Sequence, residues 1–357
     1  MVKIMQDKIL NEDLEYIVNN ECRKLEFLRN KSILITGATG LIGSQIIKVL
    51  LLFNDKRNAG IKITGMARNR EKADNIFGDW IDRRDFQMIW TDINQEIHCE
   101  TKIDYIIHGA NTTSSKEYIN QPVETAETII IGTMNILKFA VQQNIRSMVY
   151  LSSMEMYGIP YDNCGEMHED MAGYIDTLNV RSSYSEGKRT AENLCACYCG
   201  EYLVPVKIAR LAQIFGTDVS LQDNRVFVQM AMSVINQTDI VLHTNGESYG
   251  NYCYTRDAVV AILMLLDKGI NGEAYNIVNE STNIKIKDMA NLVAEKIADG
   301  NINVVYEIPD SSKTYGYAPQ VALKLSADKM NKLGWNSKVG LEEMYRRMIQ
   351  SFLYRME

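Results

Sequence analysis

Residues 32–43 read Ser-Ile-Leu-Ile-Thr-Gly-Ala-Thr-Gly-Leu-Ile-Gly, and this stretch decides the fold. Its first five residues form a short apolar run of the kind found in buried parallel strands. Residues 41–53 follow with the spacing of an amphipathic helix, and glycines occupy the turn between the two elements. Such glycines permit a tight turn and let the backbone approach a pyrophosphate, which the helix N-terminus attracts. The turn therefore predicts dinucleotide binding, in preference to a purely structural role, through Gly37, Thr39, Gly40, Leu41, Ile42 and Gly43.

The same alternation of elements continues after this turn. Strands are expected at residues 61–66, near 86–90, at 103–107 and at 147–151, and helices near 70–77 and at 123–143. Strands that alternate with helices imply right-handed crossovers, which build a parallel sheet with helices on both faces. The pattern therefore predicts an α/β fold of the Rossmann type, with a doubly wound parallel sheet.

The pattern also divides the chain into three regions. Residues 1–30 form an N-terminal helical extension with its helix at 12–29, and residues 31–210 form the NAD(P)-binding Rossmann domain, which carries the catalytic residues. Residues 211–357 form mainly a smaller mixed α/β substrate lobe, partly interwoven with that domain. The later elements expected are helices at 183–202, near 224–236, 256–268, 286–298 and 340–355, and strands at 204–209 and 302–306.

Composition limits the partners and the compartment. The formal charge is −7, from 38 Lys and Arg against 45 Asp and Glu, which gives no basic footprint for nucleic acid. Residues 1–30 contain no uninterrupted apolar core, and no stretch is apolar enough to span a bilayer, so we expect a cytoplasmic protein without membrane contact. Cys195 and Cys199 share a helix face, but no second ligand pair lies nearby in sequence, so we expect no metal site.

The segments after the second, third and fourth strands bear on the cofactor. The second strand is followed by Arg68, where a carboxylate would hold the ribose 2′-hydroxyl of NAD. A guanidinium can instead pair with a 2′-phosphate, which favours NADP over NAD, although a solvated basic loop is the alternative. Asp92 is placed to bind the adenine amino group, and Ile93 and Ala110 are placed to contact the cofactor beside it.

A second group of residues carries the chemistry. Tyr184 and Lys188 lie four apart on the expected helix 183–202 and so share a face. A nearby ammonium group lowers the pKa of a phenol, and such a tyrosine can take a proton from a hydroxyl as hydride leaves for nicotinamide. Ser153 and Glu155 follow the fifth strand, where ligands bind in open α/β sheets.

Together these motifs resemble the extended short-chain dehydrogenase/reductase family, in its nucleotide-sugar epimerase, dehydratase and decarboxylase branch. The resemblance covers nearly everything from Lys31 to the C-terminus and rests on the glycine turn, on Ser-Ser-x-x-x-Tyr-Gly at residues 152–158, and on Tyr184-x-x-x-Lys188. It implies that Ser153, Tyr184 and Lys188 perform the oxidation. It also implies a nucleotide-diphosphate sugar as substrate and a homodimer built from helices 123–143 and 183–202. The residues that it places at the substrate are Ser153, Arg210, Gln213, Arg225 and Val226.

The resemblance makes Glu155 the most informative residue for the reaction. Dehydratases and decarboxylases of this branch resemble one another in having glutamate there, and a carboxylate can remove the acidic C5 proton of a 4-keto sugar. A 4,6-dehydratase is therefore the leading expectation. The alternatives are a 4-epimerase, an NADPH-dependent 4-ketoreductase, an enzyme like UDP-glucuronate decarboxylases, which residues 184–192 most resemble, and a non-catalytic nucleotide-sensing regulator.

Three positions depart from the pattern of the branch. Met154 stands where dehydratases similar to the dTDP-glucose enzyme have an acidic aspartate, and its thioether cannot donate a proton. Gly250 stands where the branch usually has a phosphate-binding arginine, which argues against decarboxylation. Gln213 replaces an asparagine of the substrate loop and has a longer reach. These differences predict an unusual substrate or subgroup.

Overall fold

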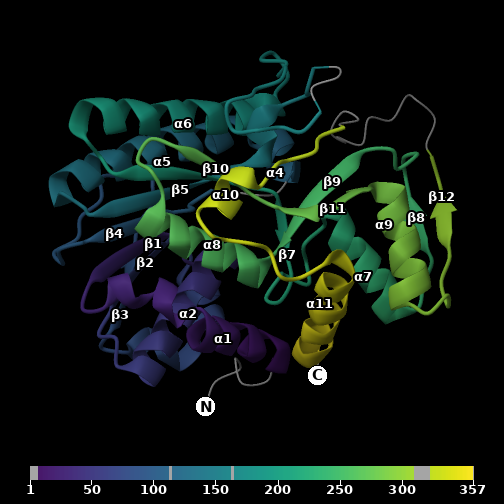
Figure 1. Cartoon of the computed structure of the whole chain (residues 1–357), viewed down its shortest axis with the longest axis horizontal. Helices are drawn as coiled ribbons and strands as arrows, with labels where there is room; N and C mark the ends of the chain where they lie inside the picture. The colour runs from purple at the N-terminus through teal and green to yellow at the C-terminus, as the bar shows by residue number, and fades with distance from the viewer. Residues whose placement is uncertain (1–6, 112–114, 162–164, 309–321, 357) are drawn as a thin grey trace.

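The computed structural model describes residues 7–111, 115–161, 165–308 and 322–356. Its centre is a seven-stranded sheet in which every neighbouring pair of strands is parallel (Figure 1). The strands in spatial order are β10 (Ala274–Ile277), β6 (Val206–Leu211), β5 (Ser147–Ser153), β4 (Tyr105–His108), β1 (Ser32–Thr36), β2 (Lys62–Ala67) and β3 (Phe86–Trp90). The Rossmann-type α/β fold predicted from the sequence is confirmed.

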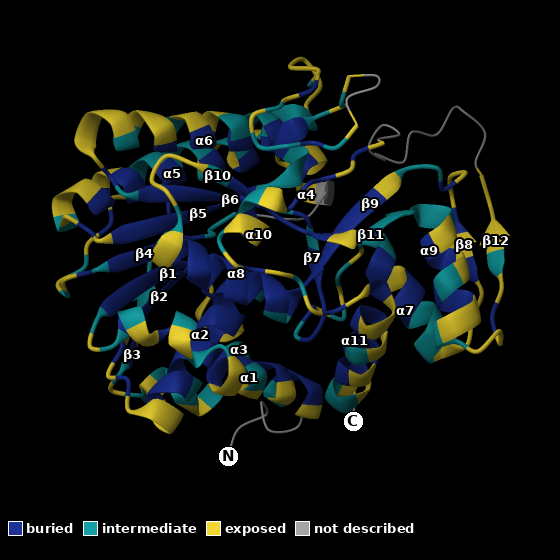
Figure 2. Cartoon of the chain, in the orientation of Figure 1, coloured by how far each residue is buried: buried dark blue, intermediate teal, exposed yellow. Residues whose placement is uncertain are grey.

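Helices cover both faces of this sheet (Figure 1). One face carries α5 (Pro122–Gln143) and α6 (Ser182–Tyr202), and the other carries α2 (Leu41–Arg57) and α8 (Thr255–Lys268). Leu34 of β1 packs with residues of α5 and α6, whereas Ile33 and Ile35 pack with residues of α2 and α8. The strands are therefore buried on both faces, as Figure 2 shows, and this explains why the sequence of β1 is a continuous apolar run.

The C-terminal lobe contains two smaller sheets and its own apolar core. The three-stranded sheet consists of β11 (Asn279–Lys285), β9 (Tyr249–Tyr254) and β7 (Gln213–Phe215), and the two-stranded sheet consists of β12 (Val304–Tyr306) and β8 (Ile240–Leu242). Its helices include α7 (Val226–Asn236), α9 (Ile286–Leu292) and α11 (Leu341–Met356). In sequence, α8 and β10 lie among the elements of the C-terminal lobe. In space, β10 is the edge strand of the seven-stranded sheet and α8 packs on a face of that sheet, so the lobe is interwoven with the first domain.

The N-terminal helix differs from its predicted range of 12–29. α1 runs over Lys8–Asn20, and Asp7 caps it by accepting a 3.0 Å hydrogen bond from the N–H of Leu10. Apolar residues up to position 28 remain buried because two 3₁₀ turns, Cys22–Lys24 and Glu26–Leu28, continue along the core. Residues 1–6 of the expected extension lie outside the described residues.

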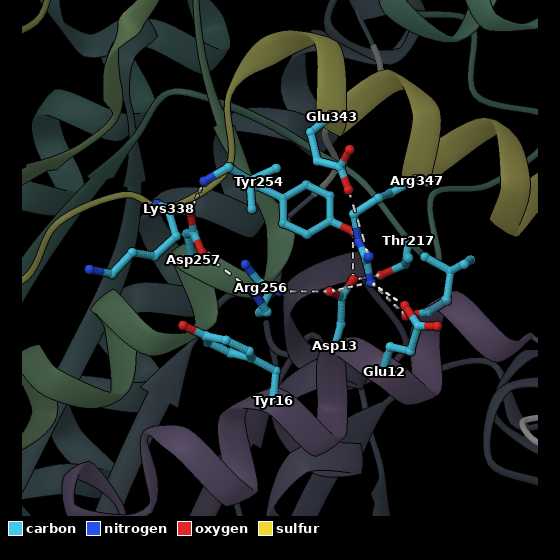
Figure 3. A network of polar contacts seen from close by, with 12 residues as sticks. Glu12, Asp13, Tyr16, Thr217, Tyr254, Arg256, Asp257, Lys338, Glu343 and Arg347 are labelled. Carbon is cyan, nitrogen blue, oxygen red and sulfur yellow. Dashed lines mark hydrogen bonds and ion pairs between the residues drawn. The ribbon is translucent and has the colours of Figure 1, made fainter.

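A buried polar network joins α1 to the C-terminal lobe (Figure 3). The carboxylate of Asp13 accepts hydrogen bonds from the hydroxyls of Tyr254 (2.6 Å) and Thr217 (2.9 Å), and it pairs with Arg347 at 3.0 Å. The carbonyl oxygen of Thr217 accepts a hydrogen bond of 2.7 Å from the side chain of Gln45 in α2. The network therefore connects the N-terminal extension, the helix of the glycine turn and the lobe.

Candidate functional site

The glycine turn packs against the end of β4 and leaves no room for side chains. A Cβ atom on Gly37 would lie 2.5 Å from the carbonyl oxygen of Gly109, and one on Gly43 would lie 2.3 Å from that of Gly37. Gly37 also has a φ of +68°, in the left-handed region. Gly40 is the N-cap residue of α2 and makes no side-chain hydrogen bond to the helix. The first N–H groups of α2 are therefore suited to bind an anion. The other residues predicted at the turn are half-buried: Thr39, Leu41 and Ile42.

Thr36 holds the chain after β4 next to this turn. Its hydroxyl oxygen accepts hydrogen bonds of 3.2 Å from the N–H groups of Gly109 and Ala110. The same hydroxyl lies 2.7 Å from Nδ1 of His108. Burial and the nearby Lys188 lower the pKa of His108 to about 3, so this imidazole stays neutral. Ala110, predicted to contact the cofactor, is thereby fixed beside Gly37.

Asn111 directly follows Ala110 and was missed in the sequence analysis. Both polar atoms of its side-chain amide are buried, and neither has a hydrogen-bond partner among the residues that the structure describes. A buried amide normally finds partners, so an unpaired one indicates that a bound group completes the site. Together with the close-packed glycine turn, Asn111 makes this end of β1 and β4 fit a bound dinucleotide.

The predicted adenosine end lies beyond β2 and β3. Arg68 follows β2 and is 72% exposed, and its Nη1 lies 3.2 Å from the carboxylate of Asp92 after β3. The two side chains predicted to contact the cofactor therefore pair with each other. Ile93 is buried against Gly132 of α5, which places its side chain in the core between the sheet and that helix.

Ser153, Tyr184 and Lys188 come together at the end of β5. Nζ of Lys188 donates a 2.7 Å hydrogen bond to the carbonyl oxygen of Leu151 and lies 5.6 Å from the centre of the Tyr184 ring. Tyr184 makes a side-chain hydrogen bond with Ser153. Burial lowers the pKa of Lys188 to about 7, although the negative charge of Glu192 opposes this shift.

The environment of Tyr184 corrects one prediction from the sequence. We expected the ammonium group of Lys188 to lower the pKa of this phenol, but burial and the negative charge of Glu155 raise it to about 12. Hydrogen bonds with Ser153 and Tyr118 oppose the increase. Helical spacing alone could not show this balance, because it depends on how deeply both side chains are buried.

Glu155 lies in the same cluster and pairs with Arg181, at the start of α6. Oε2 of Glu155 is 3.4 Å from Nη1 of Arg181, yet within the described part of the chain neither this oxygen nor Nε of Arg181 has a hydrogen-bond partner. Burial raises the pKa of Glu155, whereas Arg181 and a hydrogen bond with Ser185 lower it. The carboxyl group therefore has an acceptor position available, and its raised pKa suits a group that takes up a proton.

Arg210 has a different environment from the one predicted. Its side chain is buried, and its Nη2 pairs with the carboxylate of Glu192 at 2.8 Å. Nη1 donates to the Tyr157 hydroxyl (3.0 Å) and to the carbonyl oxygen of Glu169 (2.8 Å). These protein groups occupy the guanidinium in the structure, and the contact of Arg210 with substrate stays a prediction.

The remaining predicted substrate residues lie on β7 and at the start of α7. Gln213 is the first residue of β7 and is half-buried. Arg225 precedes α7, pairs with Asp223 and is 29% exposed, and its positive charge acts on Tyr184. Val226 is the first residue of α7 and is also half-buried. Of these three residues, Arg225 is the one whose charge acts on the catalytic cluster, where it lowers the pKa of Tyr184.

Gly250 has no space for a larger side chain. A Cβ atom there would lie 2.2 Å from the hydroxyl oxygen of Tyr252, which is completely buried and has no hydrogen-bond partner. The phenol of Tyr252 therefore occupies the region into which a side chain at position 250 would extend. An arginine could enter only if Tyr252 moved.

The described residues contain neither a helix suited to span a membrane nor a cluster suited to bind a metal ion. Across residues 7–111, 115–161, 165–308 and 322–356, no helix is long and apolar enough to cross a membrane. Within the same ranges, no three His, Cys, Asp or Glu side chains gather so that they could hold a metal ion.

Comparison with known proteins places this geometry in a family. Residues 33–278 match the NAD dependent epimerase/dehydratase family. The chain belongs to this family. The resemblance inferred from the glycine turn and from Tyr184 and Lys188 is thereby confirmed, and the NAD-dependent character of the family agrees with the close-packed turn.

Individual members of the NAD-dependent epimerase/dehydratase family and related structures are also similar to the chain. UDP-glucuronic acid decarboxylase 1 of Danio rerio is 28% identical over 361 residues, which cover 99% of this chain and 80% of the relative. The structure of dTDP-glucose 4,6-dehydratase from Bacillus anthracis with NAD has a TM-score of 0.74 at 19% identity, covering 90% of this chain and 96% of the other. UDP-glucose 4-epimerase from Thermotoga maritima has a TM-score of 0.74 at 21% identity, covering 91% and 100%. The two structures share the fold.

Proposed function

We propose that the chain is an enzyme that oxidises C4 of a nucleotide-diphosphate sugar and then uses Glu155 to eliminate water, as in a 4,6-dehydratase. The observation that carries this proposal is the position of Glu155 in the cluster of Ser153 and Tyr184, with an Oε2 that pairs with Arg181 but accepts no hydrogen bond from the described residues. Family membership and the similarity to enzymes named for nucleotide sugars support the substrate class.

The residues that would hold NAD(P) are those of the glycine turn together with Ala110 and Asn111. Bound nicotinamide supplies a hydride acceptor, and the reduced form supplies the hydride donor. Tyr184 would take the proton of the C4 hydroxyl, and Ser153 would hydrogen-bond the same sugar oxygen and orient it. Arg225 and the hydrogen bonds at the phenol oxygen favour its ionised form.

Glu155 would act on the resulting 4-keto sugar. Its carboxylate removes the C5 proton, the C6–O bond breaks, and a C5–C6 double bond forms. The C6 oxygen must leave as water, and Met154 has no proton to give it. We therefore assign both transfers to Glu155, which takes the C5 proton and delivers it to the departing oxygen. The hydride that left C4 would then be returned to C6, and the proton that Tyr184 took from the C4 hydroxyl would be returned to C5, directly or through solvent, which gives a 4-keto-6-deoxy sugar.

Decarboxylation is the second candidate, favoured by the relatives named UDP-glucuronic acid decarboxylases. In that reaction the C5–C6 bond of a 4-keto uronate breaks, carbon dioxide leaves, and C5 is protonated. Arg181 beside Glu155 offers a positive charge for a C6 carboxylate. The chain lacks the arginine that the branch usually has at position 250, and Tyr252 fills the space that its side chain would need. We therefore place decarboxylation second.

Product mass separates these reactions. The purified protein would be incubated with glucose, N-acetylglucosamine and glucuronic acid linked to UDP, dTDP, CDP or GDP, with NAD or NADP, and the products analysed by mass spectrometry. Loss of one water supports the dehydratase proposal, and loss of carbon dioxide from a uronate supports the decarboxylase. Unchanged mass with inverted C4 would identify an epimerase, and consumption of NADPH with a 4-keto sugar would identify a reductase.

We also propose that the site accepts NADP in addition to NAD. Arg68, and not a carboxylate, directly follows β2, and its exposed guanidinium pairs with Asp92 at 3.2 Å. A 2′-phosphate can compete for such a guanidinium through two charge-assisted hydrogen bonds.

A homodimer through α5 and α6 is the assembly that we propose. The two helices pack beside each other on one face of the sheet. α5 exposes Val123 (63%) and Val141 (37%), apolar side chains that a partner subunit would cover. Light scattering of the purified protein tests this, since a mass near 40.6 kDa would show a monomer instead.

A further inference from the structure

Tyr118 makes the closest ring contact with Tyr184. It lies on the short helix α4 (Ser115–Asn120), and its ring stacks on that of Tyr184 with centroids 4.3 Å apart and planes inclined by 13°. Tyr118 is only 2% exposed. Stacked aromatic pairs of this geometry restrict the orientation of both rings.

The two phenols are also joined by a side-chain hydrogen bond. This bond raises the pKa of Tyr118 and lowers that of Tyr184, because an ionised Tyr184 is stabilised when Tyr118 keeps its proton. Tyr118 is therefore the donor in this bond and the oxygen of Tyr184 is the acceptor. A donor aimed at an oxygen that becomes negative stabilises the ionised form.

Lys188 cannot supply this stabilisation alone. Its Nζ donates to the carbonyl oxygen of Leu151, and with a pKa lowered to about 7 it is only partly cationic at neutral pH. The other charged groups that act on Tyr184 oppose each other, since Glu155 disfavours the phenolate and Arg225 favours it. The hydroxyls of Ser153 and Tyr118 are then the remaining donors to the phenol oxygen.

We infer that Tyr118 is a positioning residue of the active site, whose ring holds the Tyr184 ring in place and whose hydroxyl stabilises the Tyr184 phenolate. As regards turnover, this inference rests on the proposed role of Tyr184 as the base that takes the proton of the sugar hydroxyl. The hydrogen bond between the two phenols exists whichever reaction follows. The effect of Tyr118 on Tyr184 can therefore be measured with or without a substrate.

Tyr118→Phe tests the inference, because phenylalanine keeps the stacked ring and removes only the hydroxyl. We expect kcat at neutral pH to fall by about 10- to 100-fold, as for loss of a hydrogen bond to a charged group. The loss should shrink as pH rises, since the ascending limb of the pH profile, which reports deprotonation of Tyr184, moves to higher pH. KM for the nucleotide sugar and the melting temperature should remain those of the wild type.

Tyr198→Phe is the matched control, because it removes a phenol hydroxyl from the same helix as Tyr184, far from the cluster. It should leave the pH profile unchanged. A Tyr118→Phe variant with the wild-type pH profile would overturn the inference, whereas a variant that also melts early would point to a merely structural role.

A measurement without substrate separates this inference from the proposed function. The ¹³Cζ chemical shift of Tyr184, assigned with Tyr184→Phe, reports the hydrogen bonds at its oxygen. We expect Tyr118→Phe to change that shift and Tyr198→Phe to leave it unchanged. If the shift responds but no nucleotide sugar is turned over, the proposed function fails and the contact between Tyr118 and Tyr184 stands. If Tyr118→Phe leaves the shift unchanged, the inference fails, whatever the activity.

Discussion

Asp13 of α1 and Arg347 of α11 form an ion pair of 3.0 Å across 334 positions of the sequence (Figure 3). Asp13 is only 1% exposed, and it also contacts Thr217 and Tyr254, which follow β7 and end β9. The N-terminal extension therefore connects β7 and β9, the strands of Gln213 and Gly250, to the domain that contains the glycine turn.

Asp13→Ala should destabilise the fold strongly. The substitution leaves the half-buried guanidinium of Arg347 without this partner and the hydroxyls of Thr217 and Tyr254 without their acceptor. We expect the free energy of unfolding, measured by urea denaturation, to fall by about 3–5 kcal/mol. The control is Glu15→Ala, which breaks the exposed pair of α1 with Lys56 and should cost less than about 1 kcal/mol. Equal, small effects of the two substitutions would contradict a role for this network.

Replacement by methionine should mainly lower stability at Arg210 and mainly impair kinetics at Arg225. Arg210→Met removes the buried partner of Glu192, so we expect about 3–5 kcal/mol of lost stability with KM for the nucleotide sugar unchanged. Arg225→Met removes a partly exposed cation whose charge acts on Tyr184, so we expect impaired kinetics and a stability within about 1 kcal/mol of wild type. A raised KM in a stably folded Arg210→Met protein would restore the role predicted from the sequence.

Lys188 should make stability depend on pH. Its pKa is lowered in the folded protein to about 7 from 10.5, so between these values the unfolded chain binds the extra proton and stability rises with pH. Below pH 7 the folded protein holds a buried cation at a cost. We therefore expect Lys188→Met to be more stable than wild type at pH 7 and below, with the difference shrinking toward pH 10.5.

Denaturation curves collected across this pH range test the prediction. Exposed Lys102 supplies the control, because Lys102→Met should leave the pH dependence unchanged. A constant difference between Lys188→Met and wild type at every pH would show that Lys188 titrates normally.

Much of the architecture could be predicted from local patterns. The strand expected near 86–90 is observed as Phe86–Trp90, and the glycine turn joins β1 to α2 as predicted. These features depend on apolar runs and on the glycines of turns, and both can be recognised from a few consecutive residues. The predicted helix at 12–29 was partly wrong because buried 3₁₀ turns repeat apolar residues at a similar spacing.

The site was predicted less completely, for a physical reason. Tyr118 and Asn111 lie after β4 in a segment without periodicity, so only their packing against the catalytic cluster reveals them. The pKa of Tyr184 was expected to fall and instead rises, since burial outweighs the charge of a neighbouring lysine. Arg210 was predicted to bind substrate from the family resemblance, and the sequence does not show that it meets Glu192, which lies on another element.

Arg68→Ala should change cofactor selectivity. If the exposed guanidinium of Arg68 binds the 2′-phosphate, its loss should raise the dissociation constant of NADP about tenfold or more and leave that of NAD unchanged. Titration calorimetry measures both constants. Arg70→Ala is the matched control, because the Arg70 guanidinium lies over Trp90, 5.0 Å from its ring centre. Equal dissociation constants of NADP for Arg68→Ala and wild type would refute a phosphate-binding role.

The most direct test of the central claim is the absorbance of reduced nicotinamide after Glu155→Gln is mixed with a nucleotide sugar that the wild type dehydrates. The amide keeps the size of the side chain but cannot take the C5 proton. We predict that oxidation at C4 proceeds through Tyr184, so that reduced nicotinamide accumulates and no water is lost from the sugar. A Glu155→Gln protein that forms the dehydrated product at the wild-type rate would contradict the role proposed for Glu155.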